Sequence, residues 1–197
     1  MNLGPKLAEG KTKIIYAHPS NPQHAILFFK DDITAGDGAK HDLLKGKGKF
    51  DWVTARNCFE LLKKHGIATH YEEAPEEGYM VVHKMKMIPL ECVCRRIATG
   101  SLPKRLPFKE GQRFQPLLFE LFLKDDALHD PFINDGHAMA LNVAKKEELE
   151  AIGVTTKKVF EILESAFQKL AISLVDLKIE FGRDTKMRRA GRVEQFP

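Results

Sequence analysis

Two adjacent arginines carry the first chemical signal in this chain. Arg95 and Arg96 end a strand-like apolar run, and a tight turn of small residues follows, in which Gly100 can adopt a positive φ. Ser101 then offers a hydroxyl and an N–H, and Arg105 offers a further guanidinium. Because a guanidinium matches an oxyanion two bonds at a time, the stretch predicts a seat for a phosphate or a carboxylate. The competing interpretation is a solvated strand end with ordinary surface charge, and these residues alone leave both open.

A second signal lies near the start of the chain. Gly10 marks a turn between two strands predicted over Leu7–Tyr16, and Lys11 and Lys13 fall on one side of the second strand if side chains alternate. A glycine with accessible backbone N–H groups beside two lysines is a candidate cradle for a polyphosphate. The spacing is not that of a P-loop. An ordinary hairpin remains the competing interpretation.

Acidic residues mark two predicted loops. Asp37 stands between two glycines with Lys40 close by, which fits either a polar turn or a contact with a ligand. The longer loop, Lys124–Gly136, fits a functional segment, because long loops in compact domains are often functional. Its carboxylates are Asp125, Asp126, Asp130 and Asp135.

The stretch Ser173–Gly182 alternates in the manner of a strand. Apolar side chains point one way, and Asp176, Lys178 and Glu180 point the other, about 7 Å apart along the strand. This pattern is either a solvated face or a metal–nucleotide site, in which a carboxylate holds Mg²⁺ and the lysine contacts a phosphate.

Further elements would position these residues. Strands are predicted over Ala25–Lys30, Gln115–Leu123 and Tyr79–Ile88, the last ended by Pro89. The connections between elements are predicted to be a solvated basic loop at Lys45–Lys49 and an acidic turn at Glu72–Gly78.

Helices follow from apolar spacing. We predict an amphipathic helix over Phe50–His65, with Trp52 in the core and Gly66 as the C-cap. A short helix is expected over Ala144–Ile152. Thr155 or Thr156 would cap a further helix with an apolar core stripe, formed by Phe160, Leu163, Phe167 and Leu170.

Composition limits the class of protein. The 197 residues, 43% apolar and 29% charged, suit one large or two small globular domains. No apolar run approaches the ~20 residues of a membrane span, and no leader peptide is recognised. The cysteines Cys58, Cys92 and Cys94 are expected to be buried free thiols, which suits a reducing cytoplasm.

The net charge of +4 is concentrated near the end of the sequence. Arg183–Pro197 holds five basic and two acidic residues, so the preceding part is almost neutral and gives no general nucleic-acid footprint. A polyanion-binding module that uses this segment is a weak alternative, because aromatic residues are not interleaved with its charges.

Five of these stretches, taken together and in order, resemble the phosphoribosylaminoimidazole-succinocarboxamide synthase (SAICAR synthetase) family. The resemblance runs from about Leu7 to Gly182. The stretches are Glu9–Lys13, Asp32–Gly38, Glu91–Ser101, Leu123–Pro131 and Leu174–Gly182.

The resemblance implies a two-lobed α+β fold related to ATP-grasp proteins, with mainly antiparallel sheets and flanking helices. Residues 1–89 would form a lobe with the glycine and lysine phosphate loop, residues 90–182 a lobe with the acceptor and metal site, and residues 183–197 a divergent basic tail. ATP would lie between the lobes. The implied reaction is ligation of carboxyaminoimidazole ribotide to L-aspartate in the cytoplasm, through an acyl phosphate, with formation of ADP and phosphate. No nucleic-acid or membrane partner is implied, and a homo-oligomer is among the options.

The resemblance also implies roles for individual residues. The cofactors would be ATP, held by Gly10, Lys11, Lys13, Lys84 and Glu91, and Mg²⁺, held by Glu180. Lys178 and Asp176 would act in catalysis. The substrate-binding residues would be Asp37, Arg95, Ser101, Arg105 and Asp130.

The sequence departs from the family pattern after Gly182. An Asp-Glu motif expected there is not found, so the strand before Gly182 is expected to lack its hairpin partner and Mg²⁺ to lack a carboxylate. The alternative function is therefore a nucleotide-binding relic without ligase chemistry.

Overall fold

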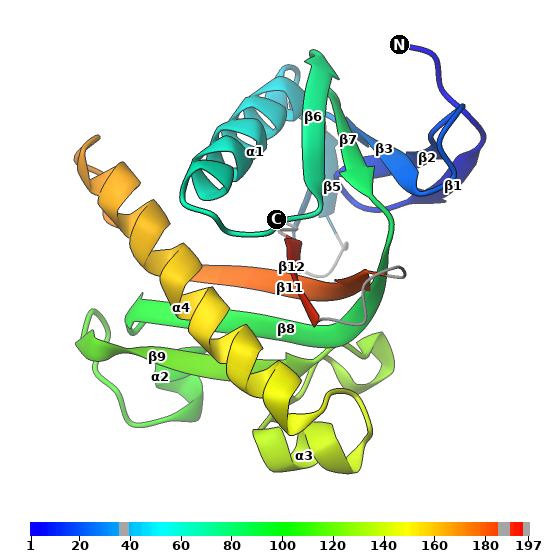
Figure 1. Cartoon of the computed structure of the whole chain (residues 1–197). Coiled ribbons are helices and arrows are strands. Elements are labelled where there is room, and N and C mark those ends of the chain that lie inside the picture. Colours follow the sequence, from blue (N-terminus) through cyan, green and yellow to red (C-terminus); the bar gives the residue numbers. More distant parts are fainter. Residues whose placement is uncertain (36–39, 185–189, 195–197) are drawn as a thin grey trace. The chain divides into compact units, whose positions relative to one another are not determined.

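The computed structural model describes residues 1–35, 40–184 and 190–194, and it divides the chain into two compact units (Figure 1). The first unit comprises Met1–Lys64 and Thr69–Met85, and the second comprises His65–Ala68 and Lys86–Pro197. The predicted Asp37 lies outside the described residues. Among the described residues, none of the helices combines the length and apolar character needed to cross a lipid bilayer.

The first unit is built on an antiparallel sheet with the strand order β1-β2-β3-β7-β6. The strands are β1 (Lys6–Glu9), β2 (Lys13–Ala17), β3 (His24–Phe29), β6 (Tyr71–Glu76) and β7 (Tyr79–His83). The hairpin and the strand near Ala25 are confirmed. The acidic turn predicted at Glu72–Gly78 is wrong, because most of it is β6, an edge strand in which exposed glutamates and Pro75 are tolerated.

Helix α1 (Lys47–Lys64) packs against β3 and β7 through Trp52, Cys58, Phe59 and Leu62. It begins three residues before the predicted start, so the solvated loop predicted at Lys45–Lys49 is wrong. Its start is fixed by Asp31, whose carboxylate accepts the N–H groups of Gly46 (3.0 Å) and Gly48 (2.8 Å). These two bonds lower the pKa of Asp31. A two-stranded sheet, β4 (Asp32–Ala35) and β5 (Lys40–Leu43), precedes the helix.

The second unit contains a sheet with the strand order β10-β9-β8-β11-β12. The strands are β8 (Met85–Ile97), β9 (Arg113–Leu123), β10 (Phe132–Ile133), β11 (Asp176–Asp184) and β12 (Ala190–Glu194). The predicted strand end at Pro89 is wrong. Strand β8 continues through this exposed proline, whose carbonyl accepts the N–H of Lys124 at 3.1 Å.

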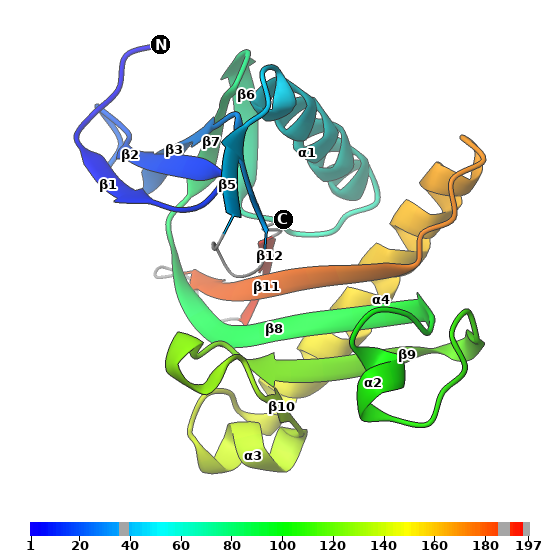
Figure 2. The same cartoon turned by 180° about the vertical axis from the view of Figure 1, so that it is seen from behind.

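The long helix α4 (Lys146–Gln168) lies across one face of this sheet (Figure 1). The strands β8, β9 and β11 are seen from their other side in Figure 2. The prediction of two helices in this region is wrong. Thr156 is buried inside α4 and its hydroxyl donates to the carbonyl of Ile152 at 2.8 Å, so it does not cap a new helix. Leu149, Ile152, Val159, Phe160 and Leu163 form the buried side of α4.

The smaller helices of this unit are α2 (Leu102–Arg105), η1 (Asp126–Leu128) and α3 (Asp135–Ala140). The loop predicted at Lys124–Gly136 therefore contains η1, strand β10 and the start of α3. Gly100 has φ 66° in the turn before α2, as expected. The three cysteines are free and buried, which confirms the prediction, and burial raises the pKa of Cys94 to about 12.

The segment after Gly182 takes part in the second unit. Strand β11 extends to Asp184 and pairs with β12 in an antiparallel arrangement, so the expectation that it lacks a hairpin partner is wrong. Arg183 donates two bonds to the carboxylate of Glu148 on α4, at 2.7 and 2.9 Å, and one to the carbonyl of Val143. This arginine therefore fastens β11 to the helix that covers the sheet.

Two glycine substitutions test this packing with opposite expected signs. A Cβ at Gly48 would lie 2.5 Å from the carbonyl oxygen of Phe29, whereas a Cβ at Gly153 in α4 would make an ordinary 3.6 Å contact with the Phe119 ring. We expect Gly48→Ala to lower the free energy of unfolding by roughly 1–3 kcal/mol. Gly153→Ala should raise it by roughly 0.5–1 kcal/mol. Urea titration followed by circular dichroism measures both, and equal effects of the two variants would contradict the packing.

Candidate functional site

The two adjacent arginines of β8 serve opposite faces of the second sheet. Arg96 donates to both carboxylate oxygens of Glu164 on α4, at 2.7 and 2.8 Å, and to the carbonyl of Phe114 at 3.0 Å. Arg95 points the other way, because successive side chains of a strand alternate. Arg96 therefore holds α4 in place, and Arg95 remains the candidate for the functional site.

The centre of the site is the buried carboxylate of Glu120 on β9, which is 4% exposed. It accepts a bond from Arg95 Nε and one from Arg105 Nη2, each 2.8 Å long. Arg95 also donates through Nη1 to Asp176 Oδ2 at 2.6 Å. The structure thus brings together three of the predicted site residues around one glutamate that the sequence analysis did not select.

Glu120 could have been found from the sequence. It is the one charged residue in the apolar run Gln115–Leu123, and a charge in a buried strand requires a partner. Arg105 is held further by aromatic rings, since its guanidinium carbon lies 5.2 Å from the centre of the Phe122 ring and 5.5 Å from that of Phe132. The hydrogen bond to Glu120 and the contacts with these two rings therefore orient the Arg105 guanidinium without a ligand.

A second group of charges lies further along β11. Lys178 donates to Glu91 Oε1 and Lys124 donates to Glu180 Oε1, each at 2.6 Å. Glu180 is 4% exposed, so this end of the strand face is buried, whereas Asp176 and Lys178 are exposed. The predicted alternation is correct, but the face is not uniformly solvated.

Lys124 completes this second group and was also missed by sequence reasoning. Burial acts to lower the pKa of its ammonium group, but the hydrogen bond to Glu180 and the charges of Glu180, Glu91 and Asp130 outweigh burial, so the pKa is raised. The ammonium group therefore stays charged at neutral pH beside Glu180. Nothing in the local sequence around Lys124 marks it as the partner of a residue 56 positions away.

Two predicted substrate residues lie in the loops of the second unit. Asp130 has a positive φ of 45°, and its carboxylate accepts the N–H of Asp125 at 2.8 Å. Ser101 is exposed at the start of α2, and its carbonyl accepts the N–H of Arg105 at 3.2 Å. The positive φ of Asp130 is a backbone conformation that non-glycine residues adopt rarely.

The predicted phosphate cradle belongs to the first unit. The N–H of Gly10 donates to the carbonyl of Lys13 at 2.8 Å and closes the turn between β1 and β2. Lys11 lies in that turn and is exposed, so the prediction that it belongs to the second strand is wrong. Lys84 lies between β7 and β8, where its N–H donates to the carbonyl of Gln23 at 2.8 Å.

Lys13 differs from the exposed Lys11 in that its side chain is buried and the pKa of its ammonium group is lowered. Its side chain is buried, with the ammonium nitrogen 5.0 Å from the centre of the Phe29 ring. Burial lowers its pKa to about 8, against a smaller opposing effect of Asp51. A lysine kept in such a position loses part of its stabilising solvation and gains most from a bound anion.

Comparison with known proteins identifies the family. The family model for SAICAR synthetase matches residues 6–189. The phosphoribosylaminoimidazole-succinocarboxamide synthase of Chloroflexus aurantiacus is 53% identical over 183 residues, which cover 93% of this chain and 74% of that protein.

Solved structures agree with the sequence comparison. A crystal structure of the enzyme of the same name from Ehrlichia chaffeensis superimposes with a TM-score of 0.92 at 31% identity, covering 98% of this chain and 81% of that one. A SAICAR synthetase in complex with ADP superimposes with a TM-score of 0.87 at 39% identity, covering 96% of this chain and 79% of that one. These matches support the ligase over the nucleotide-binding relic. The chain belongs to the SAICAR synthetase family, the ATP-dependent ligases of purine biosynthesis.

Proposed function

We propose that this chain joins the carboxylate of carboxyaminoimidazole ribotide to the amine of L-aspartate, with conversion of ATP to ADP and phosphate. Family membership over residues 6–189 is the observation that carries the proposal. The ADP in one related structure supports a nucleotide as the ligand. The charged face of the second unit offers both cations and carboxylates at fixed positions, as a reaction between anionic substrates requires.

The acceptor substrate would bind at the two guanidinium groups. Arg95 and Arg105 are oriented by Glu120, and each guanidinium carries five N–H donors, of which the described bonds to carboxylates use two on Arg95 and one on Arg105. The remaining donors suit the phosphate or a carboxylate of the ribotide, with the Ser101 hydroxyl as an additional donor. Asp130 and Asp176, together with Asp37, would contact the imidazole, the ribose or the incoming amine.

The nucleotide is assigned to the residues that the family resemblance implies for it. Gly10, Lys11 and Lys13 would contact its phosphates, and Lys84 and Glu91 would flank its base. The buried Lys13 is suited to this task because burial lowers the pKa of its ammonium group, and a bound phosphate would favour the charged form.

Glu180 fits a Mg²⁺ ligand. Carboxylate oxygen is the donor that this ion prefers, and Mg²⁺ usually takes one or two carboxylates together with substrate phosphates and water. Here Glu180 already holds a cation, the ammonium group of Lys124, at 2.6 Å. When bound, the ion would neutralise charge on the phosphates.

The proposed chemistry has two steps. The ribotide carboxylate attacks the γ-phosphorus of ATP, so that a C–O–P linkage forms and ADP leaves. The aspartate amine then attacks the acyl carbon, the new C–N bond forms, and phosphate departs as the amine loses a proton. Lys178 would neutralise the reacting carboxylate and Asp176 would orient the amine, so catalysis would rest on positioning and charge neutralisation.

The reaction is tested by following ADP release in a coupled assay with ATP, Mg²⁺, the ribotide and L-aspartate. We expect release to require the ribotide and aspartate together, with a succinocarboxamide product of matching amount by mass spectrometry. ADP release that is unaffected by omitting aspartate would contradict the ligase assignment for this chain.

The buried charge of Lys13 should lower the free energy of unfolding, although the same residue is proposed to bind ATP. Its pKa is about 8 in the folded chain and 10.5 unperturbed, so the unfolded chain holds the proton more tightly. The resulting cost is fully present below pH 8 and disappears as the pH rises to about 10.5. At pH 7, Lys13→Met should therefore raise the free energy of unfolding by ~2 kcal/mol and weaken ATP binding measured by calorimetry.

The exposed Lys11 provides the matched control for Lys13. Lys11→Met should leave the urea midpoint almost unchanged at both pH 7 and pH 10. The gain from Lys13→Met should shrink between these two pH values. A Lys13→Met protein that is less stable than the wild type at pH 7 would contradict the burial argument.

Arg95 and Arg96 allow a comparison within one dipeptide. Arg95→Lys keeps the charge but removes the planar fork, so the KM for the ribotide should rise at least 10-fold while the KM for ATP changes little. Arg96→Lys loses a two-bond contact to Glu164 on the other face and should lower the melting temperature with little effect on either KM. Equal KM changes in the two variants would disprove the assignment of Arg95 to the substrate.

A further inference from the structure

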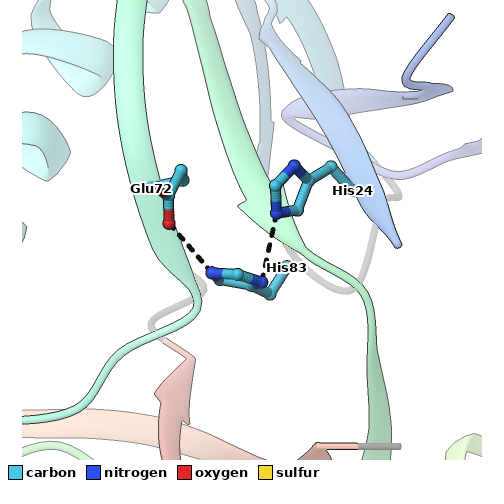
Figure 3. A group of neighbouring side chains, drawn as sticks. All are labelled: His24, Glu72 and His83. Atoms are coloured by element: carbon cyan, nitrogen blue, oxygen red, sulfur yellow. Dashed lines mark hydrogen bonds and ion pairs between the residues drawn. The ribbon is translucent and has the colours of Figure 1, made fainter. Parts of the chain in front are cut away.

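Three side chains with metal-binding atoms meet in the first unit, and none of them is among the residues proposed for the ligase reaction. They are His24 on β3, His83 on β7 and Glu72 on β6, and one donor atom of each lies within 4.8 Å of the other two. Figure 3 shows His83 in the middle, facing His24 on one side and Glu72 on the other. His24 Nε2 lies 3.2 Å from His83 Nδ1, and His83 Nε2 lies 2.9 Å from Glu72 Oε2.

The sheet itself produces this arrangement. His24 and His83 are direct cross-strand partners at the end of the β3–β7 ladder, so their side chains emerge on the same face. The register of β6 against β7 shifts between Tyr71 and Glu73, and Glu72 occupies this irregularity. A bulge of this kind re-aims a side chain, and here it directs Glu72 to His83.

The hydrogen bonds define the tautomers of both rings. Asn21 Oδ1 accepts the N–H of Gln23 at 3.0 Å, so its Nδ2 is the atom that faces His24 Nδ1, also at 3.0 Å. His24 Nδ1 is therefore an acceptor and Nε2 carries the proton, which is donated to His83 Nδ1. His83 in turn donates from Nε2 to Glu72. In this arrangement Nδ1 of each ring is an acceptor, and an accepting imidazole nitrogen is the atom that binds metals.

The facing nitrogens have the spacing of two ligands on one ion. With metal–nitrogen bonds of 2.0–2.1 Å, two ligands in a tetrahedral site lie about 3.3 Å apart, close to the 3.2 Å between His24 Nε2 and His83 Nδ1. A carboxylate on the second nitrogen of a ligating histidine fixes its tautomer and increases its basicity. Glu72 is already placed on His83 in this way.

We propose that His24 Nε2 and His83 Nδ1 bind a divalent transition-metal ion, Zn²⁺ or Cu²⁺, with Glu72 as the carboxylate partner of His83. Imidazole donors select these ions over Mg²⁺, which prefers oxygen. The side chain of Glu72 is 48% exposed and that of His83 is 28% exposed, so an ion can reach them from solvent. The ion would cross-link the ends of β3 and β7, while Glu72 connects the site to β6, and it would stabilise the first unit.

Binding requires both rings to turn from each other toward the ion, and it requires a change of protonation on His24, which offers a gain-of-function test. The proton on His24 Nε2 must leave or move to Nδ1, where Asn21 now presents a donor. Asn21→Asp would present a carboxylate that accepts the Nδ1–H, while still accepting the N–H of Gln23. This variant should therefore bind the ion more tightly than the wild type.

The experiment is a calorimetric titration of the full chain with zinc chloride in excess Mg²⁺, which occupies oxygen-only sites. We expect one zinc ion per wild-type chain, at least 10-fold weaker binding by His24→Gln and His83→Gln, and 10–100-fold weaker binding by Glu72→Gln. His129→Asn is the matched control, since it removes an exposed imidazole at a position with φ 56° that asparagine tolerates. It should bind zinc as the wild type does.

Two further measurements separate ligation from loss of structure. Zinc should raise the melting temperature of the wild type and not that of His83→Gln, and the Cu²⁺ complex should give an electron paramagnetic resonance spectrum with splitting from two nitrogens. Equal zinc affinity and stoichiometry in the wild type and His83→Gln would overturn the proposal. So would an Asn21→Asp protein that binds zinc no more tightly than the wild type.

Discussion

The second unit depends on the burial of one carboxylate. Glu120 lies inside the sheet at 4% exposure, and a buried charge is strongly destabilising unless cations and hydrogen bonds compensate it. Arg95 and Arg105 supply that compensation, and Arg95 also reaches Asp176, so that one guanidinium connects β8 with both of its neighbouring strands. The groups proposed to bind the acceptor substrate are therefore held in place by the same hydrogen bonds that compensate the buried charge of Glu120.

Much of this site could be predicted from the sequence because strand alternation is a local property. Asp176, Lys178 and Glu180 were expected on one face of one strand, and the structure places them there. Lys124 was missed because its importance comes from pairing with Glu180, 56 positions away. Glu120 carried a local signal, a charge in an apolar strand, but its partner Arg95 stands 25 positions away and could not be identified from that signal. Which arginine of the Arg95–Arg96 pair faces the helix could not be read from the dipeptide alone.

The errors in the predicted secondary structure have a common cause: tertiary contacts override the preference of the local sequence. Thr155 and Thr156 suggested the cap of a second helix, but the buried side of α4 continues across them against the sheet. Pro89 suggested a strand end, but its carbonyl still bonds to Lys124 while its ring lies exposed. The acidic run Glu72–Gly78 suggested a turn, yet as an edge strand it can expose its charges to water.

Because Arg95 and Arg96 contact opposite faces of the sheet, the register of strand β8 is sensitive to a change of one residue in its length. Removing or adding one residue upstream in the strand would turn each side chain to the other face. If Arg96 moved into the position of Arg95, it would face Glu120, but Arg95 would then occupy the fully buried position of Cys94, two residues away from the place where Arg96 now contacts Glu164. Such a shift would bury an unmatched guanidinium and break the two-bond contact between Arg96 and Glu164, so an insertion or deletion of one residue in this strand should be strongly destabilising.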